Sequence, residues 1–325
     1  MRTLVLMAAW LLAAPGSAET LREFLKANAI PATSFSKAEL DEEINGATAQ
    51  RDPIVLAAYV RIQGDAVAGD PRLVRFDKAS GTVQRAEVKP EDEGMCCGSP
   101  DDIALIEDFA LLSFHINPSA ETMLVVGKDL KLVTTLYGFD VREVAPGQVV
   151  FVENMVHFAA VHPERLEFAD LASGKTMELY PPKGDALRAA FALEHAQHMP
   201  PKATCEKMDD PCKAEDYDES IDFVDTDGHG SFAFTVQREA LHATASEQPP
   251  ESVVSEAALY RYARDGKGWL YCEEKLSDDE AKALALPPGQ RAGATASKGR
   301  CTPGLAVVPD MANADYSPFE GRKPH

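Results

Sequence analysis

Short β-forming runs separated by tight turns recur through most of the chain, and this recurrence constrains the fold more than any other feature. The clearest copy lies between Gln148 and Pro182. Its predicted strands are Val149–Glu153, Val156–Val161, Arg165–Ala169 and Thr176–Tyr180. The last turn runs from Asp170, which can bond its own backbone, to Gly174, which adopts positive φ without strain. The stretch therefore predicts a small antiparallel meander.

Weaker copies of this unit lie on both sides of it. The matching turns begin at Asp77, Gly127, Asp170 and Arg264. The first three turns lie about 40–50 residues apart, which is the period of four-stranded propeller blades, and the wider last interval indicates an insertion. Such a unit cannot bury its hydrophobic face alone, so the units are expected to stack face to face. An all-β domain is therefore predicted over residues 49–275.

The turns of the form D-x-x-S-G and G-K-D-L resemble those of degenerate, non-WD β-propellers, over roughly residues 50–275. The resemblance implies a ring of about four to five four-stranded blades. The Gly-His and Trp-Asp signature of the better-marked propeller families is absent. A two-layer β-sandwich is the all-β alternative, which the regular period disfavours. The stretch from Val156 to Arg188 also resembles exported bacterial proteins without an assigned activity.

Helical patterns flank the β region on its N-terminal side. Residues 19–48 are predicted to be helical, because Thr20–Ala29 carries apolar residues at helical spacing. Ser36–Glu39 has the form of a capping box that opens a second helix, expected to run through Ile44 and to end at Gly46.

Two further segments interrupt or follow the repeats. An insertion at 183–219 is predicted to contain a helix over Gly184–His198, ended by a proline pair. Residues 276–325 are predicted to wrap the exterior. Within them the apolar run Leu305–Val308 is a possible closing strand, which would pair with the first blade and remove the open edges.

The first residues predict export. Residues 1–18 combine a positive start at Arg2, an apolar run over Leu4–Ala14 and a small-residue cleavage site at Gly16–Ala18. The apolar run is much shorter than the roughly 20 residues that a spanning helix requires. The mature protein is therefore expected to be periplasmic or secreted, with no membrane anchor.

The charge balance disfavours one class of partner. The formal net charge is −20, and the acidic residues are dispersed along the chain. Such a surface repels phosphate backbones and anionic membranes. Nucleic acid is therefore not an expected partner.

Six cysteines in an exported chain indicate disulfides. Six cysteines allow 15 pairings, of which the favoured set is Cys205–Cys212, Cys272–Cys301 and Cys96–Cys97. The adjacent Cys96 and Cys97 either form a strained vicinal disulfide that could face a ligand, or bond to other loops. Quinone-dependent propeller dehydrogenases use such a disulfide against their cofactor, but their tryptophan docking motifs are missing here. Zinc is disfavoured because no CxxC pair is present, and no cofactor is favoured.

Two histidines end corresponding strands of neighbouring units, His115 in SFHINP and His162 in AVHPER. In a propeller these ends share one rim, where Asp185 and Arg188 of the insertion could complete a pocket. Capping of the strand ends is the simpler interpretation of both histidines. His157 is a further ligand-binding candidate, but strand alternation points it away from the face of His162.

Two patterns suggest metal sites without completing them. His195 and His198 have the i, i+3 spacing of a helical pair, but a third ligand is not evident. Asp225 and Asp227 resemble the start of a calcium loop, yet Val236 occupies the position that needs a bidentate Glu. A glycine-rich hairpin turn explains the same aspartates more simply.

The sequence thus favours an exported binding or interaction module, with an unknown small molecule or protein bound at one propeller face. The alternative is a secreted lyase or hydrolase that uses His162 and His115 in a pocket at one propeller mouth. No nucleophile elbow, Walker loop or dinucleotide fingerprint is present. Whether the protein is an enzyme stays open, because propellers host both kinds of function.

Overall fold

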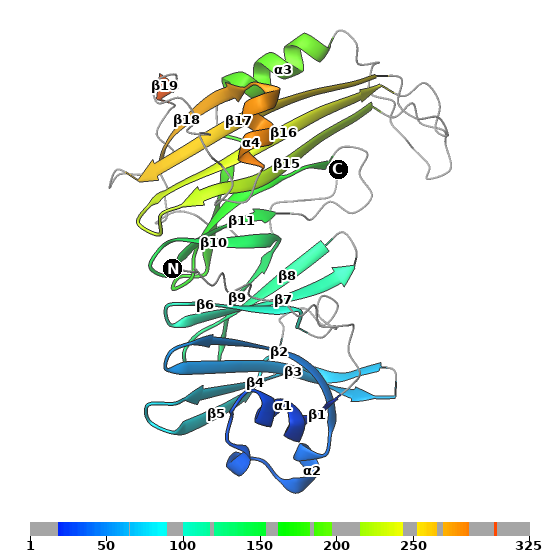
Figure 1. The fold of residues 1–325 in the computed structure, drawn as a ribbon, viewed down its shortest axis with the longest axis vertical. Coiled ribbons are helices and arrows are strands. Elements are labelled where there is room, and N and C mark those ends of the chain that lie inside the picture. The colour runs from blue at the N-terminus through cyan, green and yellow to red at the C-terminus, as the bar shows by residue number, and fades with distance from the viewer. Residues whose placement is uncertain are drawn as a thin grey trace, which may run out of the picture. The chain divides into compact units, whose positions relative to one another are not determined.

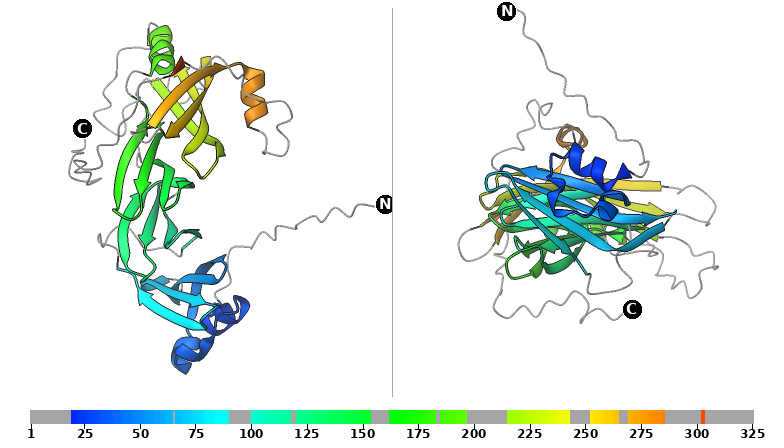
Figure 2. Two further views of the ribbon diagram at one scale, coloured as in Figure 1. Left: turned by 90° about the vertical axis from the view of Figure 1, so that its left-hand side faces the viewer. Right: turned by 90° about the horizontal axis from the view of Figure 1, so that it is seen from below.

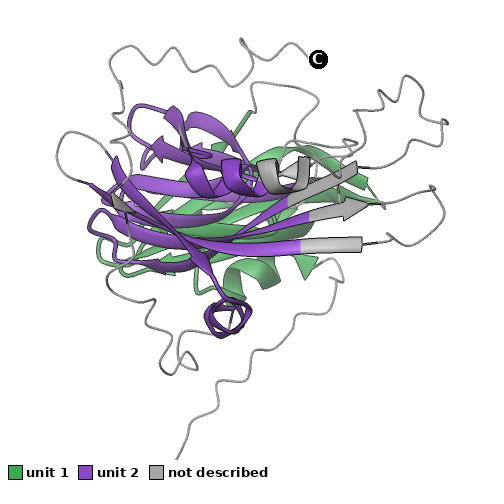
Figure 3. Cartoon of the chain, turned by 90° about the horizontal axis from the view of Figure 1, so that it is seen from above, with its two compact units in different colours: residues 1–105 green, residues 106–325 purple. Residues whose placement is uncertain are grey.

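The computed structural model describes residues 19–64, 66–89, 100–117, 120–153, 162–182, 185–196, 215–242, 252–264, 269–285 and 302–303 (Figure 1). The chain divides into two compact units, residues 1–105 and 106–325 (Figure 3). Each unit has a hydrophobic core of its own. The described residues form four β-sheets with few helices, so the all-β prediction is confirmed.

The first sheet follows the order of the chain. It comprises β1 (Glu19–Thr20), β2 (Glu43–Arg51), β3 (Ile54–Gln63), β4 (Ala66–Asp77) and β5 (Thr82–Glu87). Its strands are antiparallel throughout, and the turn between β4 and β5 has the predicted chemistry. Asp77 accepts the backbone N–H of Ala79 at 2.9 Å, and Gly81 has a φ of 70°.

Short helices cover one face of this sheet. They are α1 (Leu21–Ala27), the 3-10 helix η1 (Ala32–Ser34) and α2 (Lys37–Leu40). Thr20 and Ser36 begin α1 and α2 with complete capping boxes. The helices and sheet share a core made of Leu21, Phe24, Leu25, Ile30, Phe35, Leu40, Ile44, Val55, Ala57, Tyr59 and Val74. Each fully buried large apolar side chain in such a core contributes about 1.5–3 kcal/mol.

The structure corrects the prediction that residues 19–48 are helical throughout. Helix α2 ends at Leu40, and β2 begins at Glu43 as the opening strand of the first repeat. Asn45 and Gly46, which the pattern identified as a helix end, lie on β2 at a point where β2 and β3 approach each other closely. A Cβ on Gly46 would lie 2.5 Å from the carbonyl oxygen of Ala58 on β3, so the position requires glycine.

The second sheet is a four-stranded meander. It comprises β6 (Asp102–Ile106), β7 (Phe109–Asn117), β8 (Ala120–Val126) and β9 (Leu132–Tyr137). Consecutive residues are buried on its middle strands, such as Leu111 and Leu112 on β7 and Leu124 and Val125 on β8. Burial of consecutive residues means that both faces of these strands are covered.

The third sheet includes a strand that the sequence pattern missed. It comprises β10 (Phe139–Ala145), β11 (Gln148–Glu153), β13 (Arg165–Asp170) and β14 (Lys175–Tyr180), in that order. The predicted strand Val156–Val161 lies outside the described residues. The predicted turn between β13 and β14 is present: Asp170 accepts the backbone N–H of Ser173 at 2.9 Å, and Gly174 has a φ of 68°.

The fourth sheet is the largest. It comprises β12 (His162–Pro163), β15 (Glu215–Thr226), β16 (Ser231–His242), β17 (Ser252–Arg264), β18 (Trp269–Leu276) and β19 (Thr302–Pro303). The pairing of β12 with β15 is parallel and the other pairings are antiparallel. The β15 strand begins at Glu215, so the predicted insertion at 183–219 is too long at its C-terminal end.

Two helices accompany this sheet. Helix α3 (Ala186–Ala196) lies within the predicted insertion, and α4 (Asp278–Leu284) follows β18. Leu284 of α4 packs against Leu259 and Leu276 of the sheet. In the described part of the chain, no helix has the length and apolar character to cross a bilayer.

The third and fourth sheets pack face to face through one large aromatic core (Figures 1 and 2). The rings of Phe168 on β13 and Trp269 on β18 meet edge to face, with centroids 5.7 Å apart. No described strand pairs the fourth sheet with the first, and Leu305–Val308 lies outside the described residues. Closure of the sheets into a propeller ring therefore stays a prediction.

Candidate functional site

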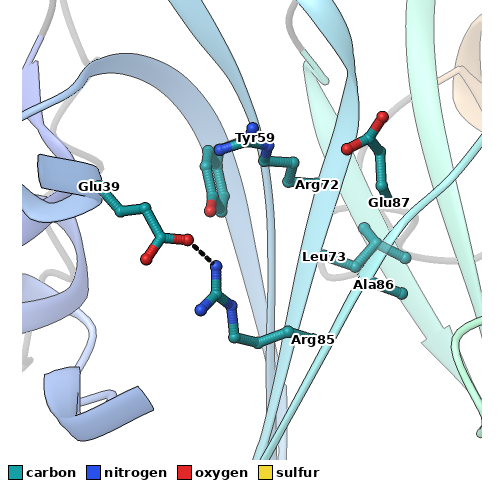
Figure 4. Close-up of a pocket in the computed structure, with 7 residues that line it drawn as sticks. All are labelled: Glu39, Tyr59, Arg72, Leu73, Arg85, Ala86 and Glu87. Atoms are coloured by element: carbon teal, nitrogen blue, oxygen red, sulfur yellow. Dashed lines mark hydrogen bonds and ion pairs between the residues drawn. The ribbon is translucent and has the colours of Figure 1, made fainter. Parts of the chain in front are cut away.

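A pocket of 390 Å³ opens in the first unit, beside α2 and the strands β3, β4 and β5 (Figure 4). The residues that line it are Glu39, Tyr59, Arg72, Leu73, Arg85, Ala86 and Glu87. Its volume falls in the range of about 300–1,000 Å³ that is usual for small-molecule sites. The pocket is therefore the candidate ligand site of this unit.

Strand register explains why charged groups gather at this point. Tyr59, Arg72 and Glu87 are direct neighbours across β3, β4 and β5. Arg85 stands two residues before Glu87 and pairs with Val74. Because side chains alternate along a strand, all of these face the side that the helices cover. The apolar layer under the helices ends at Tyr59, and the charged pocket begins there.

Arg85 is held in place from three directions. Its Nη1 donates to the Ser34 carbonyl at 2.6 Å, and its guanidinium lies 4.1 Å from the centroid of the Phe35 ring. Figure 4 shows its ion pair with Glu39, which reaches across from α2. The bonds from Arg85 and from Ser36 lower the pKa of Glu39 to about 2. Glu39 is therefore a fixed negative charge at neutral pH.

Arg72 is anchored by a second carboxylate. Its Nη1 lies 3.1 Å from Oε2 of Glu42, whose other oxygen is 4.0 Å from Nη1 of Arg61. Tyr59 is only 1% exposed, and this burial raises the pKa of its hydroxyl, which therefore stays neutral. Glu87 on β5 also lines the pocket, so the three guanidiniums of Arg61, Arg72 and Arg85 are matched by the three carboxylates of Glu39, Glu42 and Glu87.

A second polar cluster lies buried in the other unit, around Arg238 on β16. This side chain has no exposed surface. Its Nε lies 3.2 Å from Oε1 of Glu219 on β15, and its Nη1 lies 2.9 Å from Oε1 of Glu256 on β17. Its Nη2 donates to the hydroxyls of Tyr180, at 3.1 Å, and Tyr260. The paired strands therefore surround one buried cation with anions and hydroxyls.

The structure brings two predicted site residues, Asp185 and Arg188, into this cluster. Asp185 accepts the Tyr260 hydroxyl at 2.7 Å and the backbone N–H of Arg188 at 2.8 Å, which caps α3. Arg188 donates from Nε to Glu219 at 3.0 Å. These two residues therefore fasten α3 to the fourth sheet, and their partners are Glu219 and Arg238.

Glu273 on β18 adds a further carboxyl beside Asp185. Its Oε1 accepts the backbone N–H of Ala186 at 2.9 Å. Burial, the charge of Asp185 and a hydrogen bond with Asp185 raise the pKa of Glu273 to about 7. Glu273 therefore keeps its proton up to about neutral pH, at the start of α3.

The two predicted rim histidines lie in different sheets. His115 is on β7 of the second sheet, where its Nε2 is 3.1 Å from Oε1 of Glu121. His162 is on β12 of the fourth sheet, paired with Asp218, and its side chain lies outside the described residues. A shared pocket for these histidines stays a prediction.

The remaining candidates are resolved only in part. Asp227 accepts the backbone N–H groups of His229 at 2.7 Å and Ser231 at 2.9 Å, so it anchors the hairpin turn after Asp225. No group of three or more potential metal ligands occurs among the described residues. The candidates outside the described residues or with undescribed side chains are Cys96, Cys97, His157, His195, His198, Cys205, Cys212 and Cys301.

Cys272 on β18 is disulfide-bonded, and its partner lies outside the described residues. The strand pairing aligns Cys272 with Pro303. Cys301 stands two residues before Pro303. The Cys272–Cys301 pairing itself stays a prediction.

Sequence reasoning missed the pocket residues Tyr59, Arg72 and Arg85. The available signal was an arginine at a strand position whose neighbours of the same parity are apolar: Arg72 shares its face with Val74, and Arg85 with Val83. That pattern can be recognised only when the strand register is known.

Comparison with known proteins adds little to this description. No protein-family model matches the sequence, and the search of curated proteins finds no match. Among solved structures, the β-propeller domain of the Trilobed protease from Pyrococcus furiosus, described with an open velcro topology, is similar at 7% sequence identity and a TM-score of 0.22. The match covers 74% of this chain and 82% of that chain. A TM-score this low does not establish a common fold.

Proposed function

We propose that the protein is an exported binding module, periplasmic or secreted, whose ligand site is the pocket of the first unit. The observation that carries the proposal is a 390 Å³ pocket whose charged walls are already held by Glu39 and Glu42. Side chains that are ordered before binding lose little further freedom when a ligand arrives. Such a preordered wall is suited to binding a ligand.

The ionisation states in the pocket support binding over catalysis. The pKa of Glu39 is held at about 2, and burial raises the pKa of Tyr59 above its ordinary value of 10. Efficient proton transfer requires a group that titrates near the working pH. Neither group titrates there, and the arginines keep their charge. The lyase or hydrolase alternative depends on His115 and His162, which belong to different sheets.

The proposed scaffold is a series of blade-like sheets. Each sheet is built largely from strands that are consecutive in sequence, and the third and fourth sheets pack face to face. Both features are expected of propeller blades. A ring of these sheets would present loops at two mouths for a protein partner, in addition to the pocket.

A blocking experiment tests the pocket as a binding site. A mixed set of neutral, anionic and cationic fragments is screened by saturation-transfer NMR against the wild-type protein. Glu87→Trp places an indole at the exposed rim of the pocket, and Gln84→Trp places one on the same strand but on the opposite face. We expect bound fragments to lose at least about tenfold in affinity with Glu87→Trp and to keep it with Gln84→Trp. Fragments that bind both variants equally, or none that bind at all, would contradict the proposal.

A further inference from the structure

The charge of the pocket differs from that of the chain as a whole. The chain carries a formal net charge of −20. At the pocket, by contrast, the guanidiniums of Arg61, Arg72 and Arg85 are matched in number by the carboxylates of Glu39, Glu42 and Glu87. The pocket is therefore balanced in charge within a strongly acidic chain. An anionic ligand does not meet there the repulsion that the acidic surface exerts elsewhere.

The two arginines that line the pocket also have donors to spare within the described structure. A guanidinium carries five N–H donors in a planar fork. Arg85 uses Nη1 for the Ser34 carbonyl and Nη2 for Glu39, and Arg72 uses Nη1 for Glu42 and is also hydrogen-bonded to Tyr59. The planar fork matches the geometry of a carboxylate or a phosphate.

Other ligand classes fit less well. Two carboxylates line the pocket among the described residues, Glu39 and Glu87, and a metal cation would have to displace Arg85 from Glu39 to use both. A nucleic acid would bring many phosphates to an acidic surface. A small anion in the pocket interacts mainly with the charges of the pocket itself, because the acidic groups beyond about 8 Å are screened at physiological ionic strength.

The size and lining of the pocket indicate an organic body as well as a charged group. A volume of 390 Å³ exceeds what a bare oxyanion fills. Tyr59 adds an aromatic ring on the face of the arginines, whereas the side chains of Leu73 and Ala86 stand at alternate positions and face the other side of the sheet. The arginines and the ring together indicate a small organic acid.

We propose that the pocket binds a small organic acid through its oxyanion, which lies against Arg72 and Arg85. The inference rests on the proposed binding function and specifies the ligand class for that site. Glu39 is then a competitor for Arg85, and its removal should strengthen binding. A purely structural ion cluster would not give that gain.

Calorimetric titration with three probes tests the proposal. The probes are benzoate, its neutral analogue benzamide, and phenyl phosphate, which distinguishes a carboxylate site from a phosphate site. We expect benzoate or phenyl phosphate to bind the full protein at least about tenfold more tightly than benzamide. The tighter of the two anions identifies the oxyanion.

Three variants separate binding from folding. Arg72→Gln should weaken anion binding at least about tenfold. Glu39→Gln keeps a residue that suits the capping box and removes the competing charge, so anion binding should strengthen about three- to tenfold. Arg75→Gln is the matched control: Arg75 is also on β4 but faces the other side, near Gln84. It should leave binding unchanged, and thermal unfolding of each variant verifies the fold.

The outcomes distinguish the two proposals. Equal binding of benzamide and benzoate, or weaker anion binding in Glu39→Gln, would overturn the oxyanion assignment. If neutral or cationic fragments bind and are blocked by Glu87→Trp, the binding function survives and only the ligand class is wrong. If no fragment of any charge binds, both proposals fail.

Discussion

At the scale of single residues, the fourth sheet shows how a buried charge is tolerated. Arg238 would be costly in the interior without partners, and Glu219, Glu256 and two tyrosine hydroxyls supply them. Arg188 also pairs with Glu219, and Lys275 pairs with Glu256. Glu273, by contrast, is partly buried and lies beside the negative charge of Asp185, which explains why it retains its proton.

The raised pKa of Glu273 gives a prediction with a defined sign. The folded state binds the proton of Glu273 up to a pKa of about 7, whereas the ordinary value is 4.5. Between these two pH values the folded state holds more protons, so the contribution of Glu273 to stability is full below pH 4.5 and is lost as pH rises through about 7.

Urea unfolding at pH 5 and at pH 8 measures this contribution. From pH 5 to pH 8 the wild-type protein should lose the contribution of Glu273, and Glu273→Gln should not. We therefore expect the stability of Glu273→Gln relative to wild type to rise by roughly 1 kcal/mol over this interval, a value that allows for solvent screening of this partly exposed group. Comparison with wild type removes the contribution of groups that titrate independently of Glu273. An identical pH dependence in both proteins would contradict the assignment.

At the scale of elements, sequence patterns predicted strands best where a tight turn marks their ends. β13 and β14 match the predicted strands Arg165–Ala169 and Thr176–Tyr180 to within one residue at each end. β10 was missed because two register shifts interrupt its pairing with β11 and Asp140 has a φ of 51°. β2 was misread because its Asn45-Gly46 pair has the composition of a helix end.

The charged pocket could not be predicted by the same route. Its residues Arg72 and Arg85 stand on two strands, and only the pairing of β4 with β5 brings their side chains to one face. A shift of one residue in that register would send one of them to the other side. Asp185 and Arg188 were correctly singled out, but their partners lie on strands far along the chain.

The close approach of β2 and β3 gives a prediction for the first unit. A methyl group at Gly46 would meet backbone at 2.5 Å, so the strands must separate. We expect Gly46→Ala to destabilise this unit by about 1–3 kcal/mol, measured by far-UV circular dichroism on heating. Gly127→Ala is the control, because the nearest atom to its added methyl is a carboxylate oxygen of the Asp129 side chain, at 3.2 Å, and the other neighbours lie at ordinary van der Waals distance. Equal losses in the two variants would contradict the packing argument.

At the scale of the whole molecule, each of the two units has a hydrophobic core, and these two cores share no residue. Trp269 belongs to the second unit and is fully buried there, and the other tryptophan, Trp10, lies in the predicted signal. Tryptophan emission from a chain that begins at Glu19 therefore reports on the second unit. Circular dichroism reports on both.

This separation predicts how the units respond to substitution. Arg238→Ala removes the buried cation that Glu219 and Glu256 share and leaves them only Arg188 and Lys275, which should cost the second unit about 3–5 kcal/mol. We expect an earlier urea transition in tryptophan emission. Arg165→Ala removes a half-exposed ion pair with Glu178 and should cost no more than about 1 kcal/mol. A normal emission transition in Arg238→Ala would show that the cluster contributes little.

The Arg238 cluster also restricts how related sequences can diverge. Loss of the arginine alone leaves Glu219 with Arg188 and Glu256 with Lys275 as their remaining cations, and loss of either acid alone leaves the buried arginine short of one anion, so each single step is costly. Replacement of all three by apolar residues removes the desolvation cost altogether. Homologous chains should therefore carry the three positions as a covarying set, either ionic throughout or apolar throughout, with mixed combinations rare.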